Sequence, residues 1–254
     1  MNEEQALSRR VLAMLDATLL RIDASADDVL ALCRKSDSSA GRVAAVCVLP
    51  EWIETARTAL ARSAEPEASV KVASVANFPE GHSDIDRAVD DVRRVIKLGA
   101  DEIDLVFPWH ALLEGNEASG QGLVAACREA APRHILKVIL ETGELGEPEL
   151  IQRAAELAIA GGADFVKTST GTTSVGATPQ AVAVLLATIR NDGREVGCKV
   201  SGGVRTLEQA FEYLDLAREI MGEDWPAPAR FRIGASGLLE QALRAIGFVD
   251  TSFT

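Results

Sequence analysis

Short hydrophobic runs recur along the chain, and each gives way to polar or glycine-rich residues and then to a segment with helical spacing. Short apolar runs bounded in this way are typical of buried strands, and the segments between them are long enough for one helix each. The pattern therefore predicts strands that alternate with helices. The eight runs are VLAMLDATL, VAAVCVLP, VKVASVANFP, DEIDLVFP, HILKVILETG, DFVKTSTG, GCKVSGG and RFRIGAS, of which the first could instead be the end of an opening helix.

Capping signals mark where some of the intervening helices begin and end. Ser83 followed by Asp86 predicts a capping box at the start of one helix, and Gly99 predicts the end of the same helix. Thr178 before Pro179 predicts another helix start, with a side-chain cap and a proline in the first turn.

Strands that alternate with helices indicate parallel βαβ units. Eight such units in 254 residues match the size of a (β/α)8 TIM barrel, and no Pro/Ser-rich linker divides the chain. We therefore expect an α/β fold in which residues 1–254 form a single barrel domain with an extra N-terminal helix. The alternative is an open doubly wound sheet, which would be expected to carry a glycine fingerprint after its first strand. VLAMLDATLL has none.

Active sites of such barrels lie at the carboxyl ends of the strands and in the loops that follow. Polar residues at the ends of the expected strands are therefore candidates for the site. They are Asp16, Thr18, Cys47, Asn77, Asp104, Lys137, Glu141, Lys167, Thr168, Ser169, Lys199, Ser201 and Ser236.

Two lysines lie inside neighbouring expected strands, Lys167 in DFVKTSTG and Lys199 in GCKVSGG. Adjacent strands are about 4.7–4.9 Å apart, and two ammonium groups at about 5 Å repel by roughly 3 kcal/mol at an effective dielectric of about 20. This repulsion and burial both favour a neutral amine, which is the nucleophile that forms a Schiff base with a carbonyl. Lys167 is the better candidate because Phe165 and Val166 flank it. Alternatively, both lysines pair with acids such as Asp104 or Glu141, or extend to the rim.

Glycine-rich loops follow the last two expected strands, SGGVRT at 201–206 and IGASG at 233–237. Loops at these positions, together with a helix N-terminus, form the recurrent phosphate site of this fold. Gly171 could close that site from the other side, although all these glycines could also be ordinary turn and cap residues. Asp104 could relay protons near Lys167, or it could be a counter-ion of Lys199 or Lys137.

Composition narrows the range of partners. A net charge of −12 argues against a nucleic-acid or anionic-membrane partner, because both need a basic surface. Four widely spaced cysteines without a CxxC pair, and three histidines in separate segments, predict no metal site and a reducing compartment. The N-terminal segment is not a secretory signal, and no run approaches the roughly 20 apolar residues of a membrane span. We therefore expect a cytoplasmic protein that acts on small molecules.

The motifs DFVKTSTG, GCKVSGGVRT, DEIDLVFP, LDATLL, AAVCVLP, ANFPEG, LKVILETGEL and RFRIGASG together resemble the 2-deoxyribose-5-phosphate aldolase family, from about residue 10 to about residue 247. The resemblance implies a (β/α)8 barrel and a class I aldolase that needs no metal or other cofactor. Such enzymes reversibly cleave 2-deoxy-D-ribose 5-phosphate to D-glyceraldehyde 3-phosphate and acetaldehyde, in deoxynucleoside breakdown. It also implies a homodimer.

The resemblance assigns roles to individual positions. Lys167 matches the Schiff-base lysine, Lys199 the second lysine that depresses its pKa, and Asp104 the proton-relay aspartate. The remaining matches concern substrate binding: the pocket positions Asp16, Thr18 and Cys47, the motif residues Thr168 and Thr170, and the phosphate loops with Gly171, Gly202, Gly203, Val204, Arg205, Gly234 and Ser236.

Three departures from the family pattern concern phosphate binding and proton transfer. Thr172 stands where some relatives carry a lysine, and Gly237 where many carry a second serine. The chain ends in TSFT without the terminal tyrosine of some relatives, and its one tyrosine, Tyr213, falls in an expected outer helix.

Two other functions remain open at this stage. One is a related Schiff-base aldolase acting on another sugar phosphate, such as a ketose. The other is a catalytically silent barrel that binds a sugar phosphate, against which the intact Lys167, Lys199 and Asp104 argue.

Overall fold

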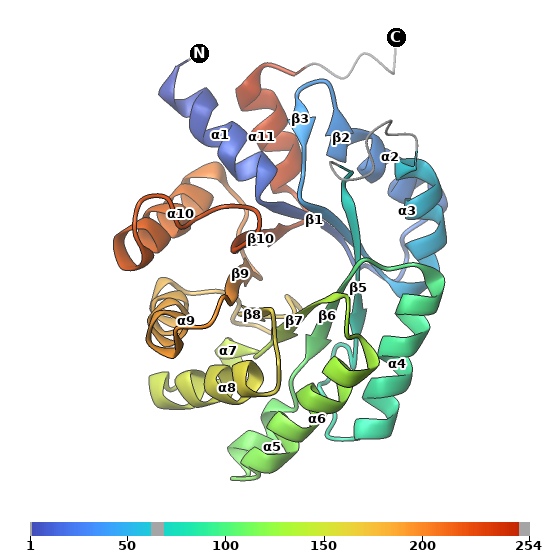
Figure 1. Cartoon of the computed structure of the whole chain (residues 1–254). Coiled ribbons are helices and arrows are strands. Elements are labelled where there is room, and N and C mark those ends of the chain that lie inside the picture. The colour runs from blue at the N-terminus through green and yellow to red at the C-terminus, as the bar shows by residue number, and fades with distance from the viewer. Residues whose placement is uncertain (1, 62–68, 249–254) are drawn as a thin grey trace.

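The computed structural model describes residues 2–61 and 69–248, and its centre is a closed barrel of eight parallel strands (Figure 1). Neighbours around the barrel follow the order β1-β10-β9-β8-β7-β6-β5-β4. Each expected hydrophobic run contains one of these strands, which confirms the predicted (β/α)8 barrel. The barrel strands are β1 Leu15–Leu19, β4 Ala45–Val48, β5 Lys71–Ala76, β6 Glu102–Val106, β7 Ile135–Ile139, β8 Phe165–Lys167, β9 Gly197–Ser201 and β10 Phe231–Ala235.

Helices surround the barrel (Figure 1). The extra N-terminal helix α1 (Glu3–Ala13) was expected, and it packs against the last helix α11 (Leu238–Ile246). No helix within the part of the chain that the structure describes is both long and apolar enough to cross a membrane. The other helices are α2 Ala26–Ser36, α3 Ile53–Leu60, α4 Ile85–Leu98, α5 Trp109–Leu113, α6 Glu117–Ala130, α7 Thr142–Leu145, α8 Pro148–Ala160, α9 Pro179–Asp192 and α10 Leu207–Met221, with a 3-10 turn at Pro50–Trp52 and a small hairpin of β2 Asp37–Ser38 and β3 Gly41–Arg42.

The helix ends agree with the capping signals in all but one case. Gly99 ends α4 in the left-handed conformation at φ 101°, and Thr178 caps α9 by accepting a hydrogen bond from the amide of Ala181. The capping box expected at Ser83 is wrong, because Asp84 caps α4 instead and accepts from the amide of Arg87 at 3.1 Å. Aspartate caps a helix as well as serine does, so the helix begins one residue later than expected.

Two kinds of packing fill the interior. The main hydrophobic core lies between the outer surface of the strands and the helices. Inside the barrel, small side chains from β4 and β5 form a separate apolar cluster of Ala45, Cys47, Ala73 and Val75. These small side chains leave room for long charged side chains from the other strands, which occupy positions that branched apolar residues usually fill in this fold.

Candidate active site

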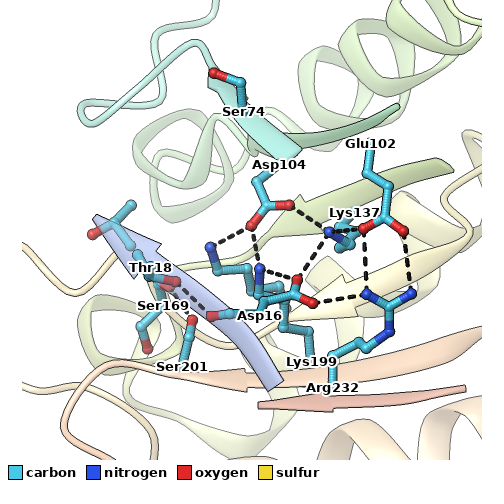
Figure 2. A network of polar contacts seen from close by, with 12 residues as sticks. Asp16, Thr18, Ser74, Glu102, Asp104, Lys137, Ser169, Lys199, Ser201 and Arg232 are labelled. Atoms are coloured by element: carbon cyan, nitrogen blue, oxygen red, sulfur yellow. Dashed lines mark hydrogen bonds and ion pairs between the residues drawn. The ribbon is translucent and has the colours of Figure 1, made fainter. Parts of the chain in front are cut away.

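Figure 2 shows a network of charged side chains that point into the barrel from six strands. Such groups are costly to bury unless each is paired with an opposite charge. In the described structure the network contains three carboxylates and four cations, all at most 5% exposed. The carboxylates are Asp16, Glu102 and Asp104, and the cations are Lys137, Lys167, Lys199 and Arg232.

Asp104 holds the three lysines together at the centre of this network. Its Oδ2 accepts hydrogen bonds from Lys167 Nζ and from Lys199 Nζ, both at 2.7 Å. Its Oδ1 accepts from Lys137 Nζ at 3.1 Å. Both roles considered from the sequence therefore have a geometric basis, because Asp104 touches Lys167 and is also a counter-ion of Lys199 and Lys137.

Asp16 and Glu102 complete the network (Figure 2). Asp16 Oδ2 accepts from Lys199 at 2.5 Å and from Lys137 at 3.0 Å, and its Oδ1 accepts from Arg232 at 2.7 Å. Glu102 lies 2.5 Å from Lys137 Nζ and 3.1 Å from Arg232 Nη2. As a result Lys137 contacts three carboxylates, Lys199 contacts two and Lys167 contacts one.

This difference in pairing separates the three lysines electrostatically. Burial lowers the pKa of Lys167 below its usual value, and Lys199 acts in the same direction against the opposing pull of Asp104. Burial opposes the charge of Lys199 and of Lys137 as well, but their carboxylate partners outweigh it and raise both pKa values. With four cations and three carboxylates, the network is neutral when one lysine loses its proton. Lys167, whose pKa burial lowers while those of Lys137 and Lys199 are raised, is the lysine best suited to give up that proton.

The structure refines the explanation drawn from the sequence. Lys167 and Lys199 are paired in register on β8 and β9, as expected for neighbouring inward-facing residues. The crowding by Lys199 is present, but burial is the larger cause of the lowered pKa of Lys167. The alternative of acid pairing holds for Asp104. It is wrong for Glu141, which instead accepts hydrogen bonds from the Thr170 amide at 3.2 Å and from the Thr170 hydroxyl at 2.5 Å.

A cavity of about 430 Å³ lies at the carboxyl ends of the strands, and Lys167 is part of its wall. Two arginines, Arg21 and Arg205, line it together with Lys167, and no carboxylate is among its lining residues. The cavity is thus locally positive in a chain whose net charge is −12. Eleven of the sequence-predicted site residues line it: Thr18, Lys167, Thr170, Gly171, Ser201, Gly202, Gly203, Val204, Arg205, Gly234 and Ser236.

The glycine loops expected to bind phosphate meet on one side of this cavity. Gly202 and Gly203 adopt left-handed conformations at φ 85° and 84°, which glycine adopts without the steric cost that a Cβ brings. The loop after β8 packs directly on them, because the amide of Ala177 donates to the carbonyl of Gly202 at 2.9 Å. A Cβ on Gly176 would lie 2.3 Å from that same carbonyl oxygen, so the contact requires glycine at this position.

The other predicted site residues lie behind the cavity wall. Asp16, Asp104 and Lys199 belong to the buried network, and Cys47 is buried beside it, where desolvation first and Asp104 second raise its pKa to about 11. Thr168 exchanges hydrogen bonds with the backbone of Ser201, both at 2.9 Å. Thr168 therefore joins β8 to β9, and the structure does not bring it to the cavity surface.

Sequence reasoning missed Glu102 and Arg232 as members of the site. A signal was present, because Glu102 precedes Asp104 by two residues and Arg232 precedes Gly234 by two, so each faces the same side of its strand as a predicted site residue. Arg21, which lines the cavity, was not assigned to it either. Thr172 was named only as a departure from the family pattern in phosphate binding, and it lines the cavity as well.

Two further expectations concern the tyrosine and metal binding. Tyr213 lies in the outer helix α10, as expected, and its hydroxyl donates to the carbonyl of Ala177 at 3.0 Å. The C-terminal residues TSFT lie outside the described residues. Within residues 2–61 and 69–248, no group of three or more His, Cys, Asp or Glu side chains is placed to hold a metal ion.

Comparisons with known proteins agree with this geometry. The chain is similar to a candidate deoxyribose-phosphate aldolase from Coccidioides immitis, with 30% identity over 94% of this chain and 85% of that one and a TM-score of 0.80. A second candidate deoxyribose-phosphate aldolase, from Toxoplasma gondii ME49, is 27% identical over 99% of this chain and 98% of that one, with a TM-score of 0.87. A tetrameric deoxyribose phosphate aldolase from Aeropyrum pernix is 25% identical over 100% of this chain and 94% of that one, with a TM-score of 0.73. The model of the DeoC/LacD family of aldolases matches residues 11–239, and the chain therefore belongs to that family.

Proposed function

We propose that this aldolase reversibly cleaves 2-deoxy-D-ribose 5-phosphate to D-glyceraldehyde 3-phosphate and acetaldehyde through a Schiff base on Lys167. The observation that carries the proposal is the position of Lys167. It is the lysine of the buried network that reaches the cavity wall, it contacts one carboxylate, and burial lowers its pKa. A neutral amine at the wall of a locally positive cavity suits attack on the carbonyl of a phosphorylated sugar.

The reaction begins when Lys167 Nζ attacks the C1 aldehyde of the open-chain sugar. Loss of water gives a protonated imine, which accepts the electron pair released when the C2–C3 bond breaks. The C3 hydroxyl loses its proton in this step and becomes the aldehyde of glyceraldehyde 3-phosphate. Protonation of the remaining enamine at C2 and hydrolysis then release acetaldehyde and restore the Lys167 amine.

Asp104 is the residue best placed to move protons during these steps. Its Oδ2 lies 2.7 Å from Lys167 Nζ, so it touches the atom that gains and loses protons as the imine forms and hydrolyses. Its pKa is held well below the usual range because its three lysine partners outweigh the effect of burial. Asp104 therefore stays ionised and accepts hydrogen bonds from Lys167 Nζ and from a water that carries the proton between Lys167 and the substrate.

The phosphate would bind where the loops after β8, β9 and β10 line the cavity. Ser236 lies there just before α11, and the N-cap residue of α11, Gly237, makes no side-chain capping hydrogen bond. The first amides of this helix are therefore left for an anion, which the helix dipole also favours. By contrast, Thr206 and Gln209 cap α10 reciprocally. Arg205, on the cavity wall, supplies a positive charge.

Reductive trapping tests the covalent step. The protein would be incubated with acetaldehyde and sodium cyanoborohydride, and the modified residue located by peptide mass spectrometry. We expect a reduced ethyl group on Lys167, and none at that peptide in Lys167→Met. Wild-type protein that is folded but acquires no adduct at Lys167 would refute the proposal.

A coupled assay for glyceraldehyde 3-phosphate tests the substrate. We expect turnover of 2-deoxyribose 5-phosphate in preference to ketose phosphates. Lys167 trapping together with faster ketose phosphate cleavage would identify a different Schiff-base aldolase. Tight binding of the sugar phosphate without turnover would identify a binding protein instead.

We also infer that the protein works in the cytoplasm, in deoxynucleoside breakdown, as a homodimer. The first two rest on the proposed substrate. Since the relative from Aeropyrum pernix is described as tetrameric, light scattering of the purified protein is the direct test of the dimer, which a tetramer or a monomer would contradict.

A further inference from the structure

Arg232 and Glu102 form an ion pair at one end of the network (Figure 2). Arg232 Nη2 donates to Glu102 Oε1 at 3.1 Å, and Arg232 Nη1 donates to Asp16 Oδ1 at 2.7 Å. The Arg232 Nε group is held as well, by the carbonyl of Pro228. The two side chains are 5% and 1% exposed, and neither lines the cavity. They do not contact Lys167 in the described structure, so they have no direct part in the proposed chemistry.

An ion pair at this depth needs an explanation other than stability. Replacing a buried pair by apolar side chains of similar size is often neutral or stabilising, because desolvation offsets the attraction. Barrel interiors are ordinarily filled by branched apolar residues. Arg232 and Glu102 therefore occupy positions where Leu or Ile would pack well, and the charges must serve something within reach of them.

A chain of contacts connects the pair to Lys167. Arg232 contacts Asp16, and Asp16 contacts Lys199. Glu102 contacts Lys137, and Lys137 contacts Asp104. Asp104 in turn contacts Lys167. The electrostatic effects of these residues on their neighbours' pKa values follow the same path. Arg232 helps to keep the pKa of Asp16 below its usual value, and it opposes the protonation of Lys137.

Lys167 is the group through which the network can adjust its charge. The groups that act on it directly are Asp104 from β6, Lys199 from β9 and Cys47 from β4. Lys137 from β7 contacts Asp104, and Asp16 from β1 contacts Lys199, so both act on Lys167 through these partners. Asp16 and Asp104 stay ionised because their pKa values are lowered, and Lys137 and Lys199 stay charged because theirs are raised. Cys47 stays neutral with a pKa of about 11. Among these groups, Lys167 is the one whose protonation we expect to respond when a fixed charge of the network is changed.

We propose that Arg232 and Glu102 are positioning residues that fix the charge balance of the buried network and thereby keep Lys167 available as a neutral amine. This inference rests on the proposed Schiff-base function of Lys167. Because Arg232 adds a positive charge and Glu102 a negative one, removing each must disturb Lys167 in the opposite direction.

Matched substitutions make the sign testable. Arg232→Met removes a cation, so the network of this variant is neutral when Lys167 is protonated. The rate of Lys167 ethylation should therefore begin to rise at a higher pH than in wild type. Glu102→Gln removes a negative charge at constant shape, and the same limb of the profile should move to lower pH. Lys137 and Asp104 separate Glu102 from Lys167, and a charge removed at that distance shifts the pH profile by roughly half a pH unit to one pH unit. The double variant should return close to the wild-type profile.

The readout is the initial rate of reductive ethylation at Lys167 by acetaldehyde and sodium cyanoborohydride between pH 5 and pH 9. Asp164→Asn is the control, because Asp164 lies just before β8 and pairs with Arg128 at 2.8 Å, outside the network. Its profile should match wild type. Arg232→Lys keeps the charge and should stay close to wild type too, and Glu102→Gln alone still tests the sign if Arg232→Met does not fold.

The outcomes separate this inference from the proposed function. Wild-type protein without an adduct at Lys167 at any pH defeats the proposed function. An adduct in every variant, with Arg232→Met and Glu102→Gln shifted in the same direction or not at all, defeats the charge-balance inference and leaves the proposed function standing.

Discussion

Lys199→Met tests directly whether the charge of Lys199 controls the protonation of Lys167. Lys199 donates to Asp104 Oδ2 at 2.7 Å, the same oxygen that Lys167 contacts at 2.7 Å. The two ammonium nitrogens therefore lie no farther apart than twice that distance. Methionine keeps most of the buried stem and removes the charge. Asp104 would still have Lys137 and Lys167 as partners, so we expect the variant to fold.

The geometry sets the size of the expected effect. Two unit charges at about 5 Å repel by roughly 3 kcal/mol at an effective dielectric of about 20, which is about a hundredfold in the dissociation constant of the Lys167 ammonium group. Without Lys199, Lys167 is protonated more strongly and the amine is scarcer. We expect kcat/KM for 2-deoxyribose 5-phosphate at pH 7 to fall by about two orders of magnitude and to recover substantially as the pH is raised.

The assay is kcat/KM for cleavage measured from pH 6 to pH 10. Lys35→Met is the control, because Lys35 forms an ion pair with Glu240 on the outside of the barrel at 2.6 Å and its removal should leave the profile unchanged. A loss in Lys199→Met that is equal at every pH would refute the reasoning, because it would show that Lys199 does not act through the protonation of Lys167.

Three further predictions follow from the same structure. Lys167→Met should be at least as resistant to urea as wild type at pH 7, and its stability should not rise from pH 7 to pH 9 as that of wild type does. The reason is that burial lowers the pKa of Lys167 in the folded protein, so the unfolded chain binds the extra proton. A lower urea midpoint in the variant would contradict this. Gly202→Ala should raise KM for the phosphorylated substrate more than Gly203→Ala does. Both substitutions add about 1–2 kcal/mol of left-handed strain, but only a Cβ at 202 comes within 3.1 Å of Gly176 Cα. Equal KM values would count against loop packing as the cause. Thr172→Lys adds a cation to the cavity wall. It should lower KM for 2-deoxyribose 5-phosphate about fivefold to tenfold and leave KM for 2-deoxyribose unchanged. An equal change for both sugars would show that the cation does not bind the phosphate.

The sequence allowed the fold to be predicted because strand–helix alternation is a local pattern repeated eight times. Period-two alternation also placed Lys167 and Lys199 inside the barrel, where the structure pairs them in register. The boundaries of the helices were harder to predict from the sequence. Ser83 and Asp84 are both good caps, and only the folded backbone decides that Asp84 accepts the hydrogen bond.

The network itself could not be derived from local pattern. Asp16 and Lys199 are 183 residues apart in the chain and 2.5 Å apart in space, and only closure of the barrel brings them together. Glu102 and Arg232 look from the sequence like charged residues at strand starts, and their 3.1 Å contact depends on that same closure. Likewise, the separation of Lys167 from the other lysines rests on a difference in carboxylate partners, which requires coordinates.

The most direct test of the central claim is an NMR titration of the lysine side chains in protein labelled with 13C at the lysine Cε. The Lys167 signal would be assigned by its absence in Lys167→Met. We predict that this signal titrates below the usual range of lysine, while the signals of Lys137 and Lys199 stay in the charged form beyond that range. A Lys167 signal that titrates at or above the usual value of a lysine would contradict the account.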